Sequence, residues 1–345
     1  MPVQGLCAEE SSGQIHPAIG YSPVLEIADQ PAATATKAPV IAYADTLAAP
    51  FETIEPSALV ASRAFEPTAA SASAASGTNG RLFDGGKLLL TNGITSLEGT
   101  SGGGIATWAV IAGNEMERGL GTSAHFTAVE LPDFGWRSYG FSVGINDRLE
   151  LSYARQNFDT REAGALLGLG RGYTFNQDVY AAKLRLAGDV VYGAPLLPQI
   201  SVGAEYKRSL DAPIVGLLGA NDRDGVDYTL SASKLFLSQS VLVNATARLT
   251  KANQGGLLGF GGPDNGYAVQ FEGSLAYMLS RRAVIGAEYR SKPDNLGLGE
   301  DDWLDVFAAY SLTENLTLSA AYVDLGSIAT FEDQRGGFVQ AQIAF

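Results

Sequence analysis

The sequence contains very few residues of the types that build disulfides or metal sites. Of its 345 residues only one is cysteine, two are histidine and three are methionine. A lone cysteine, Cys7, excludes an intrachain disulfide framework. The two histidines, His16 and His125, lie far apart in the sequence and form no zinc-ligand spacing with it. We therefore expect neither a metal site nor a cofactor.

Basic residues and long apolar runs are also scarce. There are 23 Lys and Arg against 37 Asp and Glu, a net charge of −14, which phosphate backbones repel, so nucleic acid is not an expected partner. No apolar run approaches ~18 residues, which argues against a helical membrane span. The first basic residue is Lys37, so the start lacks the basic region of a secretory signal. We expect a chain that is already processed or mis-started.

Two regions of different composition make up the chain. Residues 1–85 are rich in Ala, Pro, Ser and Thr and show neither a helical nor a strand period. Such a stretch buries too little apolar surface to offset its ordering entropy. It predicts a disordered periplasmic tail. The alternative is a plug or partner-binding segment anchored by Phe51 and Phe65.

Residues 86–345 instead consist of segments of about ten residues in which polar and apolar side chains alternate. In the segment QISVGAEYK, Val202 and Tyr206 lie on one face while Glu205 and Lys207 lie on the other. About ten residues is the length of a tilted strand that crosses a bilayer. The region therefore predicts an all-β domain.

A water-soluble sandwich also alternates, and two further features favour a membrane barrel. Short connections such as Ser238-Gln239 alternate with long ones such as 158–176. Aromatic residues, among them Trp108, Trp136 and Tyr180, lie near segment ends, as an interfacial girdle requires. We predict a transmembrane antiparallel up-and-down β-barrel in the bacterial outer membrane, with both termini periplasmic.

Fourteen such segments can be counted, and an even number is expected of a bacterial barrel. The first two cover about 87–97 and 104–112. The first is the weakest, because LLLTNGITSLEG alternates poorly. If it lies inside the lumen, a second segment must also be miscounted, and twelve strands is the alternative.

Several longer motifs resemble a proteobacterial family known as a domain of unknown function. They are LGLGRGYTFNQDV (167–179), GVDYTLSASKL (225–235), GAEYRSKPDNLGLG (286–299) and AYVDLGSIATFEDQRG (321–336). The resemblance covers about residues 86–345 and implies an outer-membrane β-barrel. It implies no substrate and no catalytic residue. The terminal Phe345 also looks like the signal that outer-membrane assembly machinery recognises, so that machinery and membrane lipid are the expected partners.

Charged residues on the polar faces should point into the lumen, because a basic residue facing lipid near the midplane costs up to ~2–4 kcal/mol. Mixed signs allow either ion-pair ladders that fill a narrow interior or a water-filled pore. The predicted lumen-facing charges are Glu150, Lys183, Arg185, Glu205, Lys207, Arg248, Glu272, Glu288 and Arg290.

Catalytic patterns are weak. Residues 99–103 match G-x-S-x-G, but a nucleophile elbow needs a strand-to-helix turn, and here the surroundings predict a Gly-rich hairpin. We expect no enzyme; the distant alternative is a lipid hydrolase using Ser101 or Ser123 near His125. The run Asp222–Asp227 lacks the distal glutamate of a calcium loop and predicts a solvated hairpin.

Four long loops carry apolar, Gly-rich centres, which need somewhere to bury their side chains. We expect them to pack on one another as a cap or to constrict the pore. The expected function is passive passage of small solutes; the alternative is a non-conducting structural or binding barrel. The predicted cap residues are Leu166, Leu167, Leu217, Leu218, Leu257, Leu258 and Phe260.

Overall fold

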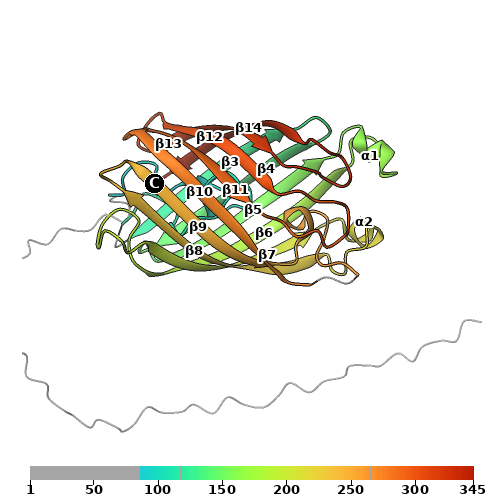
Figure 1. The fold of residues 1–345 in the computed structure, drawn as a ribbon, viewed down its shortest axis with the longest axis horizontal. Helices are drawn as coiled ribbons and strands as arrows, with labels where there is room; N and C mark the ends of the chain where they lie inside the picture. Colours follow the sequence, from blue (N-terminus) through green and yellow to red (C-terminus); the bar gives the residue numbers. More distant parts are fainter. Residues whose placement is uncertain (1–85, 117–118, 264–265) are drawn as a thin grey trace, which may run out of the picture. The chain divides into compact units, whose positions relative to one another are not determined.

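The structure, a computed structural model, describes residues 86–116, 119–263 and 266–345. Within them, twelve strands close into one antiparallel barrel in which each strand pairs with its neighbours in sequence, and β14 pairs with β3 to complete the ring (Figure 1). The predicted tail, 1–85, lies outside the described residues. The barrel strands are β3 (Leu120–Glu130), β4 (Gly135–Ile145), β5 (Leu149–Asp159), β6 (Thr174–Ala187), β7 (Gln199–Ser209), β8 (Asp224–Phe236), β9 (Val241–Thr250), β10 (Ala268–Ser280), β11 (Ala283–Arg290), β12 (Trp303–Ser311), β13 (Leu316–Asp324) and β14 (Arg335–Ala344).

The strand number is therefore twelve, the alternative, and the prediction of fourteen is wrong. The two miscounted segments, 87–97 and 104–112, lie inside the barrel, where only a two-residue pairing of β1 (Ile94–Thr95) with β2 (Ser101–Gly102) forms. Nearly every side chain from Leu90 to Ala112 is buried, whichever way it points. That two-sided burial removes the alternation that a wall strand shows.

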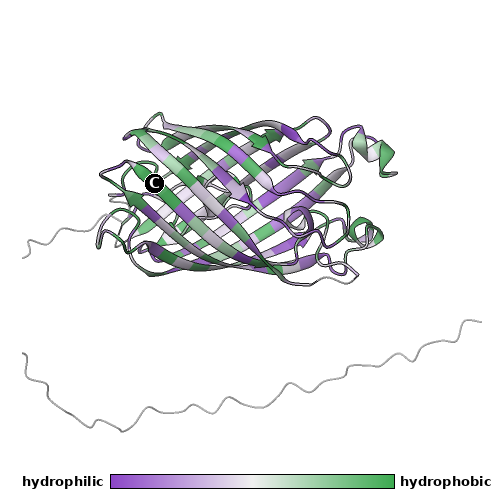
Figure 2. Cartoon of the chain, viewed as in Figure 1, coloured by the Kyte–Doolittle hydropathy of each residue, from purple (hydrophilic) through white to green (hydrophobic). Residues whose placement is uncertain are grey.

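Along the wall strands the usual burial pattern of a soluble protein is inverted. On β7, Val202 and Tyr206 are exposed on the outside, whereas Glu205 and Lys207 are buried inside. Figure 2 shows the resulting alternation of hydrophilic and hydrophobic positions along the strands. Because apolar side chains face outward and polar ones inward, the outer surface suits hydrocarbon rather than water.

The two ends of the barrel differ in their connections. Turns such as 146–148 and 281–282 join strands at one end, called here the short-turn end. Loops such as 160–173 and 251–267 join them at the other, the long-loop end. Two connections depart from this rhythm: 188–198 is long at the short-turn end, and 131–134 is short at the long-loop end. The helices α1 (Ala163–Leu166), α2 (Ala212–Leu217) and η1 (Asn253–Gly256) all belong to long loops.

Across the described ranges, none of the helices has the length and apolar character needed to span a membrane. Exposed tyrosines on the outer face include Tyr180, Tyr206, Tyr277 and Tyr322.

Two tryptophans proposed for the aromatic girdle do not belong to it. Trp136 points inward and packs edge-on against Trp303, with ring centroids 5.6 Å apart. Trp108 lies inside the barrel, where its indole N–H donates to Ser274 and Glu288. Each ring is buried because it contacts a polar or aromatic partner in the interior. Position near a segment end does not predict such a partner.

Candidate functional site

The lumen is occupied by residues 86–116, which we call the finger. Its two ends meet at the short-turn end, where Gly86 and Glu115 form an antiparallel bridge and Lys87 N–H donates to the Asn114 carbonyl at 3.2 Å. The C-terminus is at the same end, since Asn114 N–H donates to the Phe345 carbonyl at 3.0 Å. The finger therefore enters and leaves through one mouth.

Deeper in the barrel the finger contacts residues of the long loops. Leu97 and Ile105 belong to a buried apolar cluster that also contains Trp303 and the loop residues Leu258 and Leu325. Closer to the two ends of the finger, Leu90 and Trp108 pack in a second cluster at the short-turn end, with Val190 and Leu235 among its members. The finger thus runs through the interior and turns back.

Besides the bonds that the finger makes within itself, side chains of the wall supply many of the hydrogen-bond partners that the buried finger backbone requires. Glu150 accepts from the N–H groups of Ser101 and Ala112 at 2.9 and 2.8 Å. Lys183 donates back to the carbonyls of Ser101 and Val110. Further wall contacts to finger backbone come from Ser138, Gln156, Gln199, Ser201, Ser233, Asn244, Thr246, Glu272, Glu288, Arg290 and Gln340.

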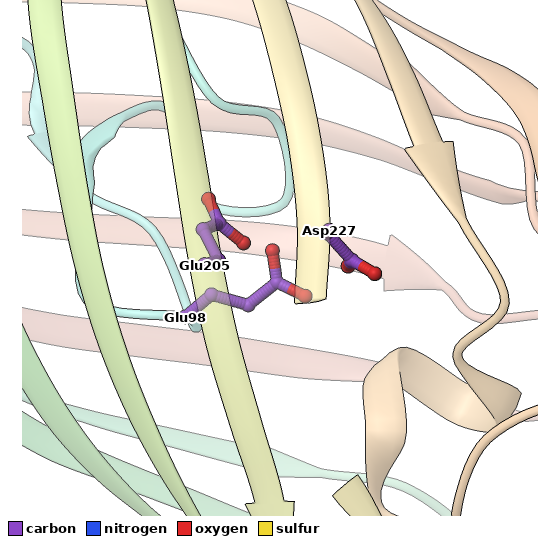
Figure 3. A group of neighbouring side chains, drawn as sticks. All are labelled: Glu98, Glu205 and Asp227. Carbon is purple, nitrogen blue, oxygen red and sulfur yellow. The ribbon is translucent and has the colours of Figure 1, made fainter. Parts of the chain in front are cut away.

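At the centre, Glu98 of the finger enters a buried network of charged wall residues. The acids Glu98, Glu205, Asp227 and Glu272 alternate in space with the bases Lys207, Arg248 and Arg290, and all seven are at most 6% exposed. Figure 3 shows Glu98 arriving from the finger beside Glu205 on β7 and Asp227 on β8. Charges so deeply buried are tolerated only when they are paired.

The distances show which bases hold Glu98. Arg290 Nη2 lies 2.8 Å from its Oε1, and Arg248 Nη2 lies 3.1 Å from its Oε2. Lys207 also pairs with Oε1. Two guanidinium groups thus approach the two oxygens of one carboxylate, an arrangement that favours planar anions.

Three of these carboxylates could be mistaken for a metal site. Ligand atoms of Glu98, Glu205 and Asp227 lie within 4.8 Å of one another. However, the Lys207 ammonium pairs with all three, and Arg248 pairs with them as well. Because these two basic side chains already pair with the three carboxylates, the cluster is a network of ion pairs and not a metal site.

The structure places eight of the nine predicted lumen charges in the interior. Glu150, Lys183, Glu205, Lys207, Arg248, Glu272, Glu288 and Arg290 are all buried. Arg185 lies instead at the short-turn end, where it pairs with Asp147 and Asp189 and stays partly exposed.

Sequence reasoning missed three buried acids of this interior. Asp227 and Asp305 alternate with apolar neighbours on β8 and β12, so the wall pattern could have identified them. Glu98 carries no such signal, because it lies on the irregular finger.

Contacts of the candidate catalytic residues favour a structural role for each. Ser101 lies on β2, within a hairpin rather than at a strand-to-helix turn. His125 Nε2 lies 3.3 Å from the Ser138 hydroxyl, and the hydroxyl of Ser123 pairs with that of Ser142 at 2.7 Å. Asp222, in the loop predicted as a solvated hairpin, pairs with Lys251.

The loop-cap residues divide into two groups. Leu257, Leu258 and Phe260 are buried in the long-loop mouth, and Leu218 packs against the same apolar cluster. Contrary to expectation, Leu166 and Leu217 are 79% and 83% exposed. They sit on α1 and α2, short helices whose other sides bury Ala163 and Val215. Leu167 is half-buried.

The loop containing η1 lies next to Glu98, since a Cβ added at Gly255 would be 3.5 Å from Glu98 Oε1. Gln177 on the wall donates to the Gly255 carbonyl at 3.1 Å, and Phe260 bridges to Asp222 and Ala252. A second contact joins the neighbouring long loops, where the Tyr173 hydroxyl donates to Asp211 at 2.6 Å. Burial and that carboxylate raise the pKa of Tyr173 to about 12.

Phe345, the proposed assembly signal, has a half-exposed side chain. Its carbonyl accepts from Thr122 N–H at 2.9 Å as well as from the finger stem. Phe345 is therefore hydrogen-bonded both to β3 and to the finger.

A family model described as "Protein of unknown function (DUF3034)" matches residues 91–342. No curated protein matches the sequence. Similar solved structures include the KdgM porin (12% identity, TM-score 0.41, covering 65% of this chain and 99% of that one) and the NanC porin (8%, 0.42, 65% and 98%). Another is outer membrane phospholipase A from Escherichia coli (9%, 0.35, 70% and 98%). At these scores none of them assigns a function to this chain.

Proposed function

The chain belongs to this family of unknown function, and we propose that it is a passage through the bacterial outer membrane for small solutes, closed at rest by its own finger. The apolar outer surface and polar interior support the membrane setting. Short turns face the periplasm in barrels of this kind, so the short-turn end, with Phe345, would lie there. Lipid and the assembly machinery are the partners this setting implies.

One observation carries the proposal: both ends of the finger leave through the same mouth, with Gly86 beside Glu115. A segment that enters and returns at one end can withdraw without threading between wall strands. The bonds between the wall and its backbone come from polar side chains, and water can replace those bonds once the finger leaves. The remaining wall would enclose a polar lumen, as in conducting barrels.

A reversible cross-link tests this directly. Thr95 of the finger lies beside Gln342 of β14, with 3.4 Å between Oγ1 and Oε1. Cysteines at both positions, in a chain with Cys7→Ser, can be joined by a short thiol cross-linker. We expect single-channel steps from the uncrosslinked protein in planar bilayers, silence after cross-linking, and recovery after reduction.

The matched control joins two wall strands without touching the finger. Ser123 and Ser142 face each other on β3 and β4 with hydroxyls 2.7 Å apart. Cysteines there should form the link and leave conductance unchanged. A protein that is silent in every state would instead identify the rival, a non-conducting structural barrel.

A further inference from the structure

We propose that Arg248 and Arg290 form a carboxylate-binding clamp on the lumen wall. Glu98 occupies the clamp while the barrel is closed, and small organic carboxylates occupy it when the finger withdraws. The inference names a solute class for the passage proposed above and rests on that proposal.

The first support is that, in each guanidinium group, some nitrogen atoms contact the wall and others contact the finger. Arg248 is anchored to the wall through Nε, 2.5 Å from Glu272, and through Nη1, 2.7 Å from Glu205. Its Nη2 faces finger groups: it forms an ion pair with Glu98 Oε2 at 3.1 Å and donates to the Thr107 hydroxyl at 2.9 Å. Withdrawal of the finger would free Nη2 while the rest of Arg248 stayed fixed.

Arg290 shows the same division more strongly. Nη2 bonds Glu98 at 2.8 Å and Nη1 bonds the Ile105 carbonyl at 3.2 Å, and both partners belong to the finger. What remains on the wall is Glu272, 3.6 Å from Nε, and the Trp303 ring, 5.1 Å below the guanidinium. The side chain therefore stays oriented and presents two empty donors to the lumen.

Lys207 differs, and this limits the site to the arginines. It keeps Asp227 at 2.7 Å and Glu205 at 3.5 Å, both on the wall, after Glu98 leaves. Lys207 thus mainly balances the neighbouring acids.

Charge counting selects the ligand. Without the finger, the bases Lys207, Arg248 and Arg290 face three wall acids, Glu205, Asp227 and Glu272. These six charges cancel, and Glu98 gives the closed cluster a net charge of −1, which one added carboxylate would restore. A phosphate would bring more negative charge next to three buried acids, where repulsion is weakly screened. A planar, singly charged carboxylate also matches the two guanidinium edges.

Chemical rescue tests the clamp in the full-length protein. Glu98→Ala removes the resident carboxylate and leaves space between the arginines. In detergent, sodium acetate should raise the Tm of this variant by several degrees over sodium chloride at equal ionic strength, because a ligand that binds only the folded state stabilises it. Wild type, whose own Glu98 fills the clamp, should show no such difference.

The double variant Glu98→Ala, Arg290→Gln is the matched control, and in it the acetate effect should be lost. If Glu98→Ala does not fold in chloride, the folded yield in acetate against chloride becomes the readout. Equal behaviour in the two salts, or rescue that survives Arg290→Gln, overturns the clamp. Absence of conductance in the cross-linking experiment overturns the proposed passage, so the two failures are distinguishable.

Discussion

Glu288 on β11 and Asp305 on β12 are cross-strand partners that lie side by side on the inner face of the wall, and both are about 1% exposed. Glu288 accepts hydrogen bonds from Ile105 N–H, Trp108 and Ser274. Neither oxygen of Asp305 has a polar partner among the residues that the structure describes. A buried carboxyl group without hydrogen-bond partners beside a second carboxyl group lowers the stability of the fold.

Asp305→Asn should therefore stabilise the barrel, by about 1 kcal/mol in the free energy of unfolding, since it keeps the side-chain shape and places beside Glu288 an amide, which cannot ionise and can donate a hydrogen bond. Urea unfolding in detergent measures the change. The contrasting variant is Asp227→Asn, which breaks pairs with Lys207 and Arg248. It should cost about 3 kcal/mol. Similar losses of unfolding free energy in the two variants would contradict this difference between the unpaired Asp305 and the paired Asp227.

Gly103→Ala should loosen the finger. A Cβ at Gly103 would lie 1.7 Å from Glu288 Oε1, so that carboxylate would have to leave its finger donors. We expect a loss of about 2 kcal/mol and more frequent channel openings. At Gly104, in the same turn, the nearest atom to an added Cβ is 3.3 Å away on Phe338. Gly104→Ala should have the smaller effect on both the free energy of unfolding and the frequency of channel openings. A larger effect at Gly104 than at Gly103 would contradict the close packing of Gly103 against Glu288.

Leu275→Arg should block insertion into the outer membrane. Leu275 is 59% exposed near the middle of β10, where a charge would meet hydrocarbon at a cost of ~2–4 kcal/mol. Leu166→Arg provides the comparison, because Leu166 is still more exposed but sits on α1 in a long loop. Heat-modifiable folded protein in membrane fractions measures assembly. Equal tolerance of both variants would mean that the outer face does not meet lipid.

The Tyr173–Asp211 contact predicts a pH-dependent link between two long loops. The pKa of Tyr173 is raised to about 12, so its contribution to stability is complete below the ordinary tyrosine value of about 10 and is lost as pH rises toward 12. Tyr173→Phe should lower the Tm at pH 8, and the difference from wild type should shrink above pH 10. Tyr180→Phe, on the outer face, is the control and should show no such trend. A difference independent of pH would exclude this role.

The wall could be predicted from sequence because each wall strand meets two different surroundings. Val202 faces outward and Glu205 inward, and their alternation survives whatever the lumen contains. The finger has the same surroundings on all sides, so residues 87–97 and 104–112 resembled poor strands. Glu98 was missed for the same reason. Leu166 and Leu217 were misplaced because a helix of one or two turns always turns some side chains outward.

The two bonds accepted by the Phe345 carbonyl, from Thr122 and from Asn114, also bear on how the molecule is built. The finger precedes every wall strand in the chain, yet the ring is complete only when the last strand meets β3. The Phe345 carbonyl then accepts hydrogen bonds both at the β14–β3 junction, which we call the seam, and from the end of the finger at Asn114. A barrel whose seam is still open lacks this anchor, so ring closure and the seating of the finger should occur as one cooperative event during biogenesis.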